Sequence, residues 1–336
     1  MKKLAVLLPT YNTELYLNES IDSILNQTFL DFDLYVYDDC STDNTEELIS
    51  KYNDNRLFYR KNAGNLGIAK TLNKGLEELL PNYEYIARMD ADDWAYPQRF
   101  EKQIYYLENN QDVILCGAQG YWLKDIKQNP STGWKYPNSN EYIKNYLLFA
   151  ASFNHQSIIF RSKFLIETSL KYDEKIITCE DWEMWTRIVK IGKVVNLPDF
   201  LIKCRILPFS NHHSPLNKKR HLEERSIIIS NYWVNFGINL SPEEVFEYYY
   251  EDKAISKPDF ILKIKILINA FNHLYKNSNH NLLHEERKNF SYMLARRILN
   301  YWKRTEVNRL SPVLWFIIIK EVRFMNKIKL IKSIIR

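Results

Sequence analysis

The first 120 residues alternate short apolar runs with segments that carry an apolar stripe at helical spacing. Residues 4–8 are an unbroken apolar run, which is typical of a strand buried on both faces of a sheet. In residues 16–27, apolar side chains recur every three or four positions, which predicts an amphipathic helix. The alternation continues, with strands expected at residues 33–37, 57–60, 85–89 and 113–117 and helices at residues 41–52 (cap included), 68–80 and 97–109.

Strands that alternate with helices predict a doubly wound, mostly parallel α/β sheet joined by right-handed crossovers. Ligands of such sheets bind at the carboxyl ends of the strands. Polar segments follow the expected strands there, and we expect them to line one crevice: Pro9, Thr10, Tyr11 and Asn12; residues 38–41; residues 62–67, with Asn65 and Gly67; and residues 90–93. No GxGxxG motif follows the first strand and no GxxxxGK[ST] motif occurs, which disfavours a dinucleotide cofactor and a P-loop hydrolase.

The segment Asp90, Ala91, Asp92 and Asp93 is the most informative of these. If the strand stays extended, Asp90 and Asp92 project to the same side, where two like charges repel unless a cation joins them. Mg²⁺ and Mn²⁺ prefer such oxygen ligands and also bind diphosphates. The alternative is a solvated acidic turn that caps the next helix, and Asp93 is the residue most suited to that role.

Asp38 and Asp39 follow the second strand. A carboxylate at this position can accept hydrogen bonds from a nucleobase N–H or from ribose hydroxyls. The alternative is that Asp38, together with Ser41 or Asp43, caps the following helix. We favour a base or ribose contact for Asp39.

A second acidic cluster, Glu180 and Asp181, begins an expected helix over residues 180–190. An ionised Asp can accept a proton from a sugar hydroxyl as that hydroxyl attacks. Trp182 and Trp185 could offer a platform for a sugar face. The alternative, which the residues alone favour, is an acidic first turn stabilised by the helix dipole with both tryptophans in the core. Polar loops are also expected around Asn154 and His155 and around His212 and His213, where either of the last two could complete a metal site.

The charge of the chain is unevenly distributed. The net charge is +5, but residues 295–336 carry +9 and the rest of the chain −4. Nucleic-acid-binding proteins are usually basic on their main body, so this class is disfavoured. The four cysteines have no CxxC spacing, and no secretory signal precedes the first strand. We expect a soluble protein of a reducing compartment.

Taken together, these motifs resemble the inverting family 2 glycosyltransferases with the GT-A fold. The resemblance spans about residues 3–210, and residues 85–93 and 180–181 look especially like the corresponding segments of bacterial lipooligosaccharide β-1,3-N-acetylglucosaminyltransferases and related β-1,3-hexosyltransferases. It rests on residues 9–12, Asn26 to Phe29, residues 38–43, Asn65 to Gly67 with Asn73 to Gly75, and residues 90–93, in that order along the chain.

The resemblance implies roles for several of these residues. Thr10, Tyr11 and Asp39 would hold the base of a UDP-sugar, Asp90 would face the ribose or the metal, and Asp92 would bind Mn²⁺ or Mg²⁺. Asp181 would be the catalytic base, with Glu180 beside it. Asn154 and His155 would lie near the acceptor. Relatives commonly carry Tyr-Arg-x-His after the last strand, whereas residues 204–207 are Cys-Arg-Ile-Leu, which leaves the third metal ligand open.

The sequence after residue 216 is helical in pattern and ends in a basic amphipathic segment. Phe324, Ile328, Ile331 and Ile335 recur at helical steps among lysines and arginines. Such a helix can lie on an anionic membrane, here the cytoplasmic face of the inner membrane, or pack on its own domain. We expect a catalytic domain over residues 1–215, with a nucleotide-sugar half (1–120) and an acceptor half (121–215), and a helical extension over residues 216–336.

The sequence thus predicts a metal-dependent inverting transferase that moves a hexose or N-acetylhexosamine from a UDP-sugar to a glycan or lipid-linked glycan during surface polysaccharide or lipooligosaccharide synthesis. Two alternatives stay open. One is a catalytically inactive sugar-nucleotide or glycan-binding protein. The other is a nucleic-acid-binding protein that uses the basic tail.

Overall fold

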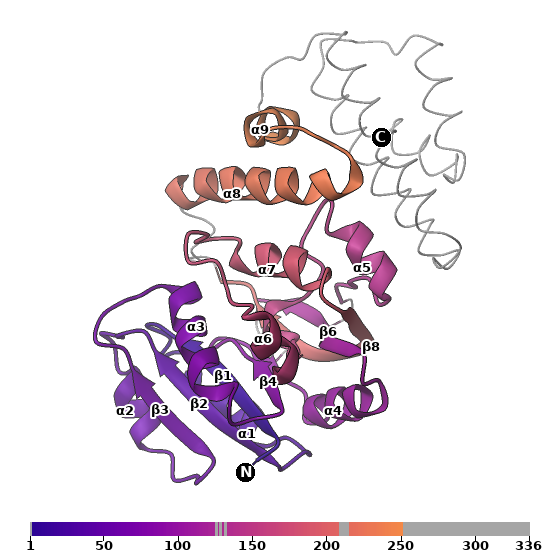
Figure 1. The fold of residues 1–336 in the computed structure, drawn as a ribbon. Helices are drawn as coiled ribbons and strands as arrows, with labels where there is room; N and C mark the ends of the chain where they lie inside the picture. Colours follow the sequence, from indigo (N-terminus) through magenta and orange to yellow (C-terminus); the bar gives the residue numbers. More distant parts are fainter. Residues whose placement is uncertain (1, 125–126, 128–129, 131–132, 208–214, 251–336) are drawn as a thin grey trace. The chain divides into compact units, whose positions relative to one another are not determined.

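The computed structural model describes residues 2–124, 127, 130, 133–207 and 215–250 (Figure 1). The described residues form one eight-stranded sheet in the order β3-β2-β1-β4-β7-β6-β8-β5. Its strands are β1 (Leu4–Thr10), β2 (Phe32–Asp38), β3 (Leu57–Lys61), β4 (Tyr85–Arg88), β5 (Trp94–Ala95), β6 (Val113–Leu123), β7 (Ile159–Arg161) and β8 (Lys193–Arg205).

The helices alternate with these strands in the first half of the chain, as the sequence predicts. They are α1 (Leu17–Leu25), α2 (Thr45–Ser50), α3 (Ile68–Leu79), α4 (Arg99–Asn109), α5 (Asn140–Tyr146), α6 (Ser162–Thr168), α7 (Glu180–Ile188), α8 (Pro215–Trp233) and α9 (Pro242–Tyr250), with short 3₁₀ turns η1 (His155–Ser157) and η3 (Val234–Phe236). The predicted α/β class is therefore confirmed.

The sheet is parallel from β3 to β4 and mixed beyond β4. Strand β1 pairs in parallel with β2 and β4, and β2 pairs in parallel with β3. Strand β7 inserts between β4 and β6 and is antiparallel to both, whereas β6 and β8 are parallel. All the parallel strands of the first half therefore end at the same edge, which gathers the polar segments that follow them.

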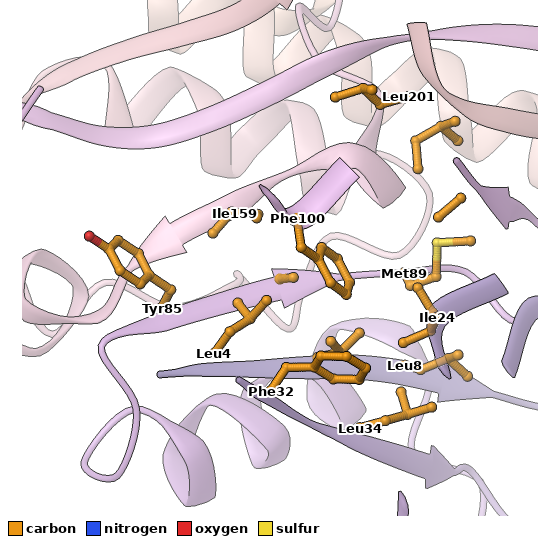
Figure 2. Close-up of a cluster of buried hydrophobic side chains, with 14 of the residues drawn as sticks. Leu4, Leu8, Ile24, Phe32, Leu34, Tyr85, Met89, Phe100, Ile159 and Leu201 are labelled. Carbon is orange, nitrogen blue, oxygen red and sulfur yellow. The ribbon is translucent and has the colours of Figure 1, made fainter. Parts of the chain in front are cut away.

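Both faces of β1 are covered, which explains its unbroken apolar sequence. Leu4 and Leu8 belong to a core that includes Ile24 of α1 and Phe100 of α4 (Figure 2). Leu7 points to the other face, where Gly75 of α3 lies so close that an added Cβ would fall 2.4 Å from Leu7 Cδ1. Burying aliphatic and aromatic side chains on both faces stabilises each by about 1.5–3 kcal/mol.

The chain divides into two compact units, residues 1–143 with 151–221, and residues 144–150 with 222–336. In the second unit, Tyr232 donates to the carbonyl of Lys144 (3.0 Å) and Trp233 Nε1 to the carbonyl of Leu148 (3.0 Å). Helix α8 is thus fastened to the 144–150 segment. Our boundaries at residues 120 and 215 stay predictions. The amphipathic segment lies outside the described residues, among which no helix is long and apolar enough to cross a membrane.

Candidate active site

The loop after β1 is braced by the loop after β2. Thr10 is buried, its hydroxyl lies 2.6 Å from that of Thr13, and its carbonyl accepts the Asp39 N–H (2.9 Å). Asn12 has a left-handed backbone (φ 52°), and its side-chain oxygen accepts the Thr42 N–H (2.8 Å). Between them, Tyr11 is 46% exposed. The bracing therefore fixes the backbone and leaves the Tyr11 ring presented at the strand end.

Asp39 connects β2 to the beginning of α3. Its Oδ1 accepts Asn62 Nδ2 (2.9 Å) and the Leu66 N–H (2.8 Å), and its Oδ2 accepts the Gly67 N–H (2.8 Å). Gly67 precedes α3 and has φ 84° and ψ 162°, a conformation that only glycine adopts readily. Asp39 thereby satisfies free N–H groups at the helix N-terminus, and one lone pair of Oδ2 remains for a further donor.

Asp38 makes its hydrogen bonds inside the protein. Its side chain is fully buried, with Oδ1 accepting the Ser41 N–H (2.8 Å) and Oδ2 accepting the Tyr59 hydroxyl (2.6 Å). Its assignment to nucleotide binding stays a prediction. Asp38 holds the 38–41 turn in shape.

The acidic segment after β4 forms a turn instead of a continued strand. Strand β4 ends at Arg88, and the Asp93 N–H donates to the Asp90 carbonyl (3.3 Å). The condition that the strand stays extended is therefore not met, but the turn still brings carboxylate oxygens of Asp90, Asp92 and Asp93 within 4.8 Å of one another. Ala91 is buried beneath them.

Arg205, at the end of β8, holds this turn from the opposite side. Its N–H donates to Asp93 Oδ1 (2.7 Å), its Nε to the Asp92 carbonyl (2.9 Å) and its Nη2 to Glu19 (2.6 Å). The interpretation of Asp93 as a helix cap is wrong, because Asp93 binds a β8 backbone N–H and α4 begins without a side-chain cap. In the sequence, Arg205 stands out only as the Arg of residues 204–207, and no role was predicted for it.

The electrostatics of the turn fit a divalent cation. Burial and the neighbouring Asp90 charge raise the pKa of Asp92 to about 6, and burial with Asp92 and Asp90 raises the pKa of Asp93 well above its usual value. Carboxylates that repel in this way are stabilised when a hard cation joins them. Asp90, Asp92 and Asp93 therefore offer a donor set that suits Mg²⁺ or Mn²⁺.

A second group of polar side chains gathers at the N-terminus of α7. Glu180 and Asp181 begin the helix, and Glu180 Oε1 lies 3.6 Å from His155 Nδ1. His155 Nε2 lies 2.8 Å from the Tyr172 hydroxyl. Burial, and the charge of Asp181, raise the pKa of Glu180 to about 8, whereas burial and Arg88 lower the pKa of His155 well below its usual value. Both groups are therefore neutral near pH 7, and Asp181 is the candidate ionised base.

Two of the predicted acceptor contacts are core residues. Trp182 and Trp185 are both buried, and Trp185 packs edge-on against His155 (ring centroids 5.6 Å apart). Our prediction of an aromatic sugar platform is wrong, because α7 turns both rings inward. Asn154 is buried as well and donates to the Ala118 carbonyl (3.3 Å), and His155 contacts Tyr172 and Glu180 instead of lying open to solvent.

Helix α3 links the two halves of the site through residues to which the sequence analysis assigned no role. Asn73 Oδ1 accepts the Tyr172 N–H (2.9 Å), and its Nδ2 donates to the Tyr172 carbonyl (3.0 Å). Lys74 donates to Asn62 Oδ1 (2.8 Å), and Asn62 in turn binds Asp39. The motif around Asn73 therefore fastens the segment before α7 to the same helix that Asp39 caps.

His212 and His213, predicted as candidate metal ligands, lie outside the described residues. Asn65 and Gly67 are exposed in the loop that Asp39 holds. The predicted strand-end residues from β1 to β4 are thus confirmed to follow neighbouring strands of the sheet. Their binding and catalytic roles stay predictions.

Comparison with known proteins places this site in a family. The model described as "Glycosyl transferase family 2" matches residues 5–170. An uncharacterized glycosyltransferase of Methanocaldococcus jannaschii is 35% identical over 277 residues, which cover 78% of this chain and 92% of that protein. The chain therefore belongs to the family 2 glycosyltransferases.

More specific names appear among other relatives. The amylovoran biosynthesis glycosyltransferase AmsE of Erwinia amylovora is 34% identical over 206 residues, covering 60% of this chain and 75% of AmsE. Residues 1–349 of S. aureus TarS, in complex with UDP-GlcNAc, superimpose with a TM-score of 0.57 at 17% identity over 91% of both chains. The mannosyltransferase PcManGT of Pyrobaculum calidifontis, solved with GDP-Man and Mn²⁺, gives 0.52 at 15% identity over 96% of this chain and 85% of that one. These two likenesses confirm the GT-A fold.

Proposed function

We propose that this glycosyltransferase moves a hexose or N-acetylhexosamine from a UDP-sugar to a glycan acceptor, with inversion at the anomeric carbon. The observation that carries the proposal is the pairing of two acidic groups in one unit: the Asp90, Asp92 and Asp93 turn and the Glu180–Asp181 helix start. Burial and the charge of Asp181 raise the pKa of Glu180, and the charge of Asp90 adds a smaller effect in the same direction, so the two acidic groups interact.

The donor proposal rests on the loop that follows β1 and on Asp39. A uracil ring can stack on the exposed Tyr11 ring, and its N–H can donate to the remaining lone pair of Asp39 Oδ2. Thr10 and Asn12 hold the Tyr11 backbone at that place. The UDP-GlcNAc bound to TarS supports a UDP-sugar, and the GDP-Man bound to PcManGT is the donor to test against it.

The metal proposal rests on the three-carboxylate turn. Asp92 and Asp90 would hold Mn²⁺ or Mg²⁺, with Asp93 behind them, tied to the Arg205 N–H. When bound, the ion offsets the negative charge of the departing diphosphate. The Mn²⁺ in PcManGT supports this choice of ion.

In the proposed reaction Asp181 accepts the proton of the acceptor hydroxyl as that oxygen attacks the anomeric carbon from the face opposite the diphosphate. Its position in the first turn of α7 favours the ionised form, because the helix N-terminus carries partial positive charge. Glu180 is protonated near pH 7 and would not compete for this proton.

The test is D181N, which removes the base and keeps the size of the side chain. We expect UDP-sugar binding within about threefold of wild type, and transfer to fall by roughly 10²–10⁴-fold, the usual contribution of a general base. E183Q is the matched control, because Glu183 lies in the same helical turn and pairs with Arg187. Full transfer by D181N would remove Asp181 from the base role.

The choice of sugar is tested by offering UDP-Glc, UDP-Gal, UDP-GlcNAc, UDP-GalNAc and GDP-Man with Mn²⁺ and measuring nucleotide release. Nucleotide release distinguishes an active enzyme from an inactive sugar-nucleotide-binding protein. We place the reaction in surface polysaccharide or lipooligosaccharide synthesis, which the name of AmsE supports. The lysines and arginines that recur along residues 320–336 support contact with an anionic membrane that carries a lipid-linked acceptor.

A further inference from the structure

Arg88 is the last residue of β4 and lies at the centre of the sheet. It is aligned with Leu7 of β1, and its N–H donates to the Ile158 carbonyl (3.0 Å), so its backbone is fixed from both sides. Its side chain is 5% exposed and forms an ion pair with Asp90 Oδ2. Nothing in the sequence analysis or in the proposed reaction uses this buried cation.

The surroundings of the guanidinium are those of the proposed active site. Burial lowers the pKa of Arg88, whereas the charges of Asp90, Tyr172 and Glu180 raise it. On balance the pKa is raised. The charge of Arg88 in turn lowers the pKa values of His155, Asp92 and Asp93. Its Nη1 is the atom of the ion pair with Asp90, and within the described part of the chain its Nε has no hydrogen-bond partner. A buried guanidinium with an unused donor is costly unless its charge is needed there.

We propose that Arg88 is a positioning residue for sugar transfer: it fixes Asp90 by an ion pair and supplies a permanent buried charge between the Asp90–Asp93 turn and the Glu180–Asp181 pair. This inference rests on the proposed function. Two acidic groups in one buried environment repel, and a fixed cation between them lets both keep their places. Because Arg88 also opposes a metal cation beside Asp90, its removal changes transfer and metal binding in opposite directions.

The test compares R88M, R88K and R161M, each as the full chain. Arg161 is the control, because it is equally buried in the same sheet. It is the last residue of β7 and pairs with Tyr85 at the start of β4, where it donates to the Tyr85 hydroxyl (2.9 Å). Transfer is measured as UDP release with acceptor, Mn²⁺ binding by electron paramagnetic resonance with UDP present, and folding by thermal melting.

For R88M we expect transfer to fall by about 10²-fold, the effect of misplacing a reacting group by about 1 Å, while Mn²⁺ binds about tenfold more tightly. R88K, which keeps the charge, should recover at least about tenfold of that loss. R161M should melt earlier but transfer at the wild-type rate per folded molecule. A purely structural Arg88 would weaken Mn²⁺ binding and transfer together, and that result, or transfer within about threefold of wild type, would overturn the inference.

If R88M does not fold, a double-mutant cycle that combines R88K with D90N tests the inference. A role through Asp90 predicts that R88K costs much less activity in the D90N background than in wild type, whereas equal losses refute it. Failure of the proposed function is distinguishable, because the wild-type chain would then release no UDP from any UDP-sugar. The Mn²⁺ comparison between wild type and R88M still tests Arg88 in that case.

Discussion

Replacing Asp39 by Asn tests whether one carboxylate fixes the loop before α3. The carboxylate accepts three hydrogen bonds, from Asn62 and from the N–H groups of Leu66 and Gly67. An Asn side chain has the same shape but presents one NH₂ group. Whichever way the amide is turned, that NH₂ faces at least one N–H donor, and the remaining bonds lose their charge assistance.

The loss of folding free energy is smallest when the NH₂ faces the Gly67 N–H, because Gly67 is exposed and its N–H can donate to water instead. One hydrogen bond to a charged acceptor contributes about 1.5–3 kcal/mol, so D39N should cost about 2 kcal/mol. For a compact unit of this size, that lowers Tm by about 4–8 °C. Because the freed loop begins α3, the affinity for UDP should also fall by about tenfold.

The assay is thermal melting together with hydrogen–deuterium exchange of a peptide that spans residues 62–70. D31N is the matched control, since the Asp31 side chain is exposed and the substitution has the same chemistry. D39N should accelerate exchange at Leu66 and Gly67 and D31N should not. A melting temperature and exchange pattern equal to those of D31N would refute the assignment of Asp39 as the clamp of this loop.

Two further predictions concern the same site. G67A should destabilise the chain by about 1–3 kcal/mol, because Gly67 has φ 84°, whereas G64A in the same loop has open space and no such strain and should melt like wild type. E180Q should match wild type in stability at pH 4.5 and be more stable than wild type at pH 9. The contribution of protonated Glu180 is complete only below its unfolded pKa of 4.5 and is lost progressively as pH rises to its folded pKa of about 8, which melting curves at the two pH values measure. An equal fall in Tm for both proteins would contradict this.

The strands and helices of the first 120 residues could be predicted because their patterns are local. A buried strand such as residues 4–8 needs apolar side chains on both faces, and an amphipathic helix needs one stripe, so the period alone separates them. The site's position followed from topology, because parallel strands end at one edge. What each strand-end residue contacts did not follow.

Two cases show why contacts are harder to predict. Asp38 and Asp39 are neighbours of the same type, yet one is sealed by Tyr59 and the other holds a loop more than twenty residues away. Trp185 follows the acidic pair in a way that suits a sugar platform, but the orientation of α7 buries it. In each case the deciding partner is distant in sequence, and a single chain contains no signal for such a pair.

The contacts also change what the motifs mean. Asp39 holds residues 66 and 67, Asn73 holds Tyr172, and Arg205 holds the turn of Asp92 and Asp93. Each joins two segments far apart in the chain, and each joined segment carries or adjoins a proposed ligand-binding or catalytic group. A substitution in these motifs therefore shifts backbone geometry before it removes a ligand contact. Loss of activity alone cannot identify a binding residue here, because only a variant that keeps the loop geometry, such as D181N, separates chemistry from positioning.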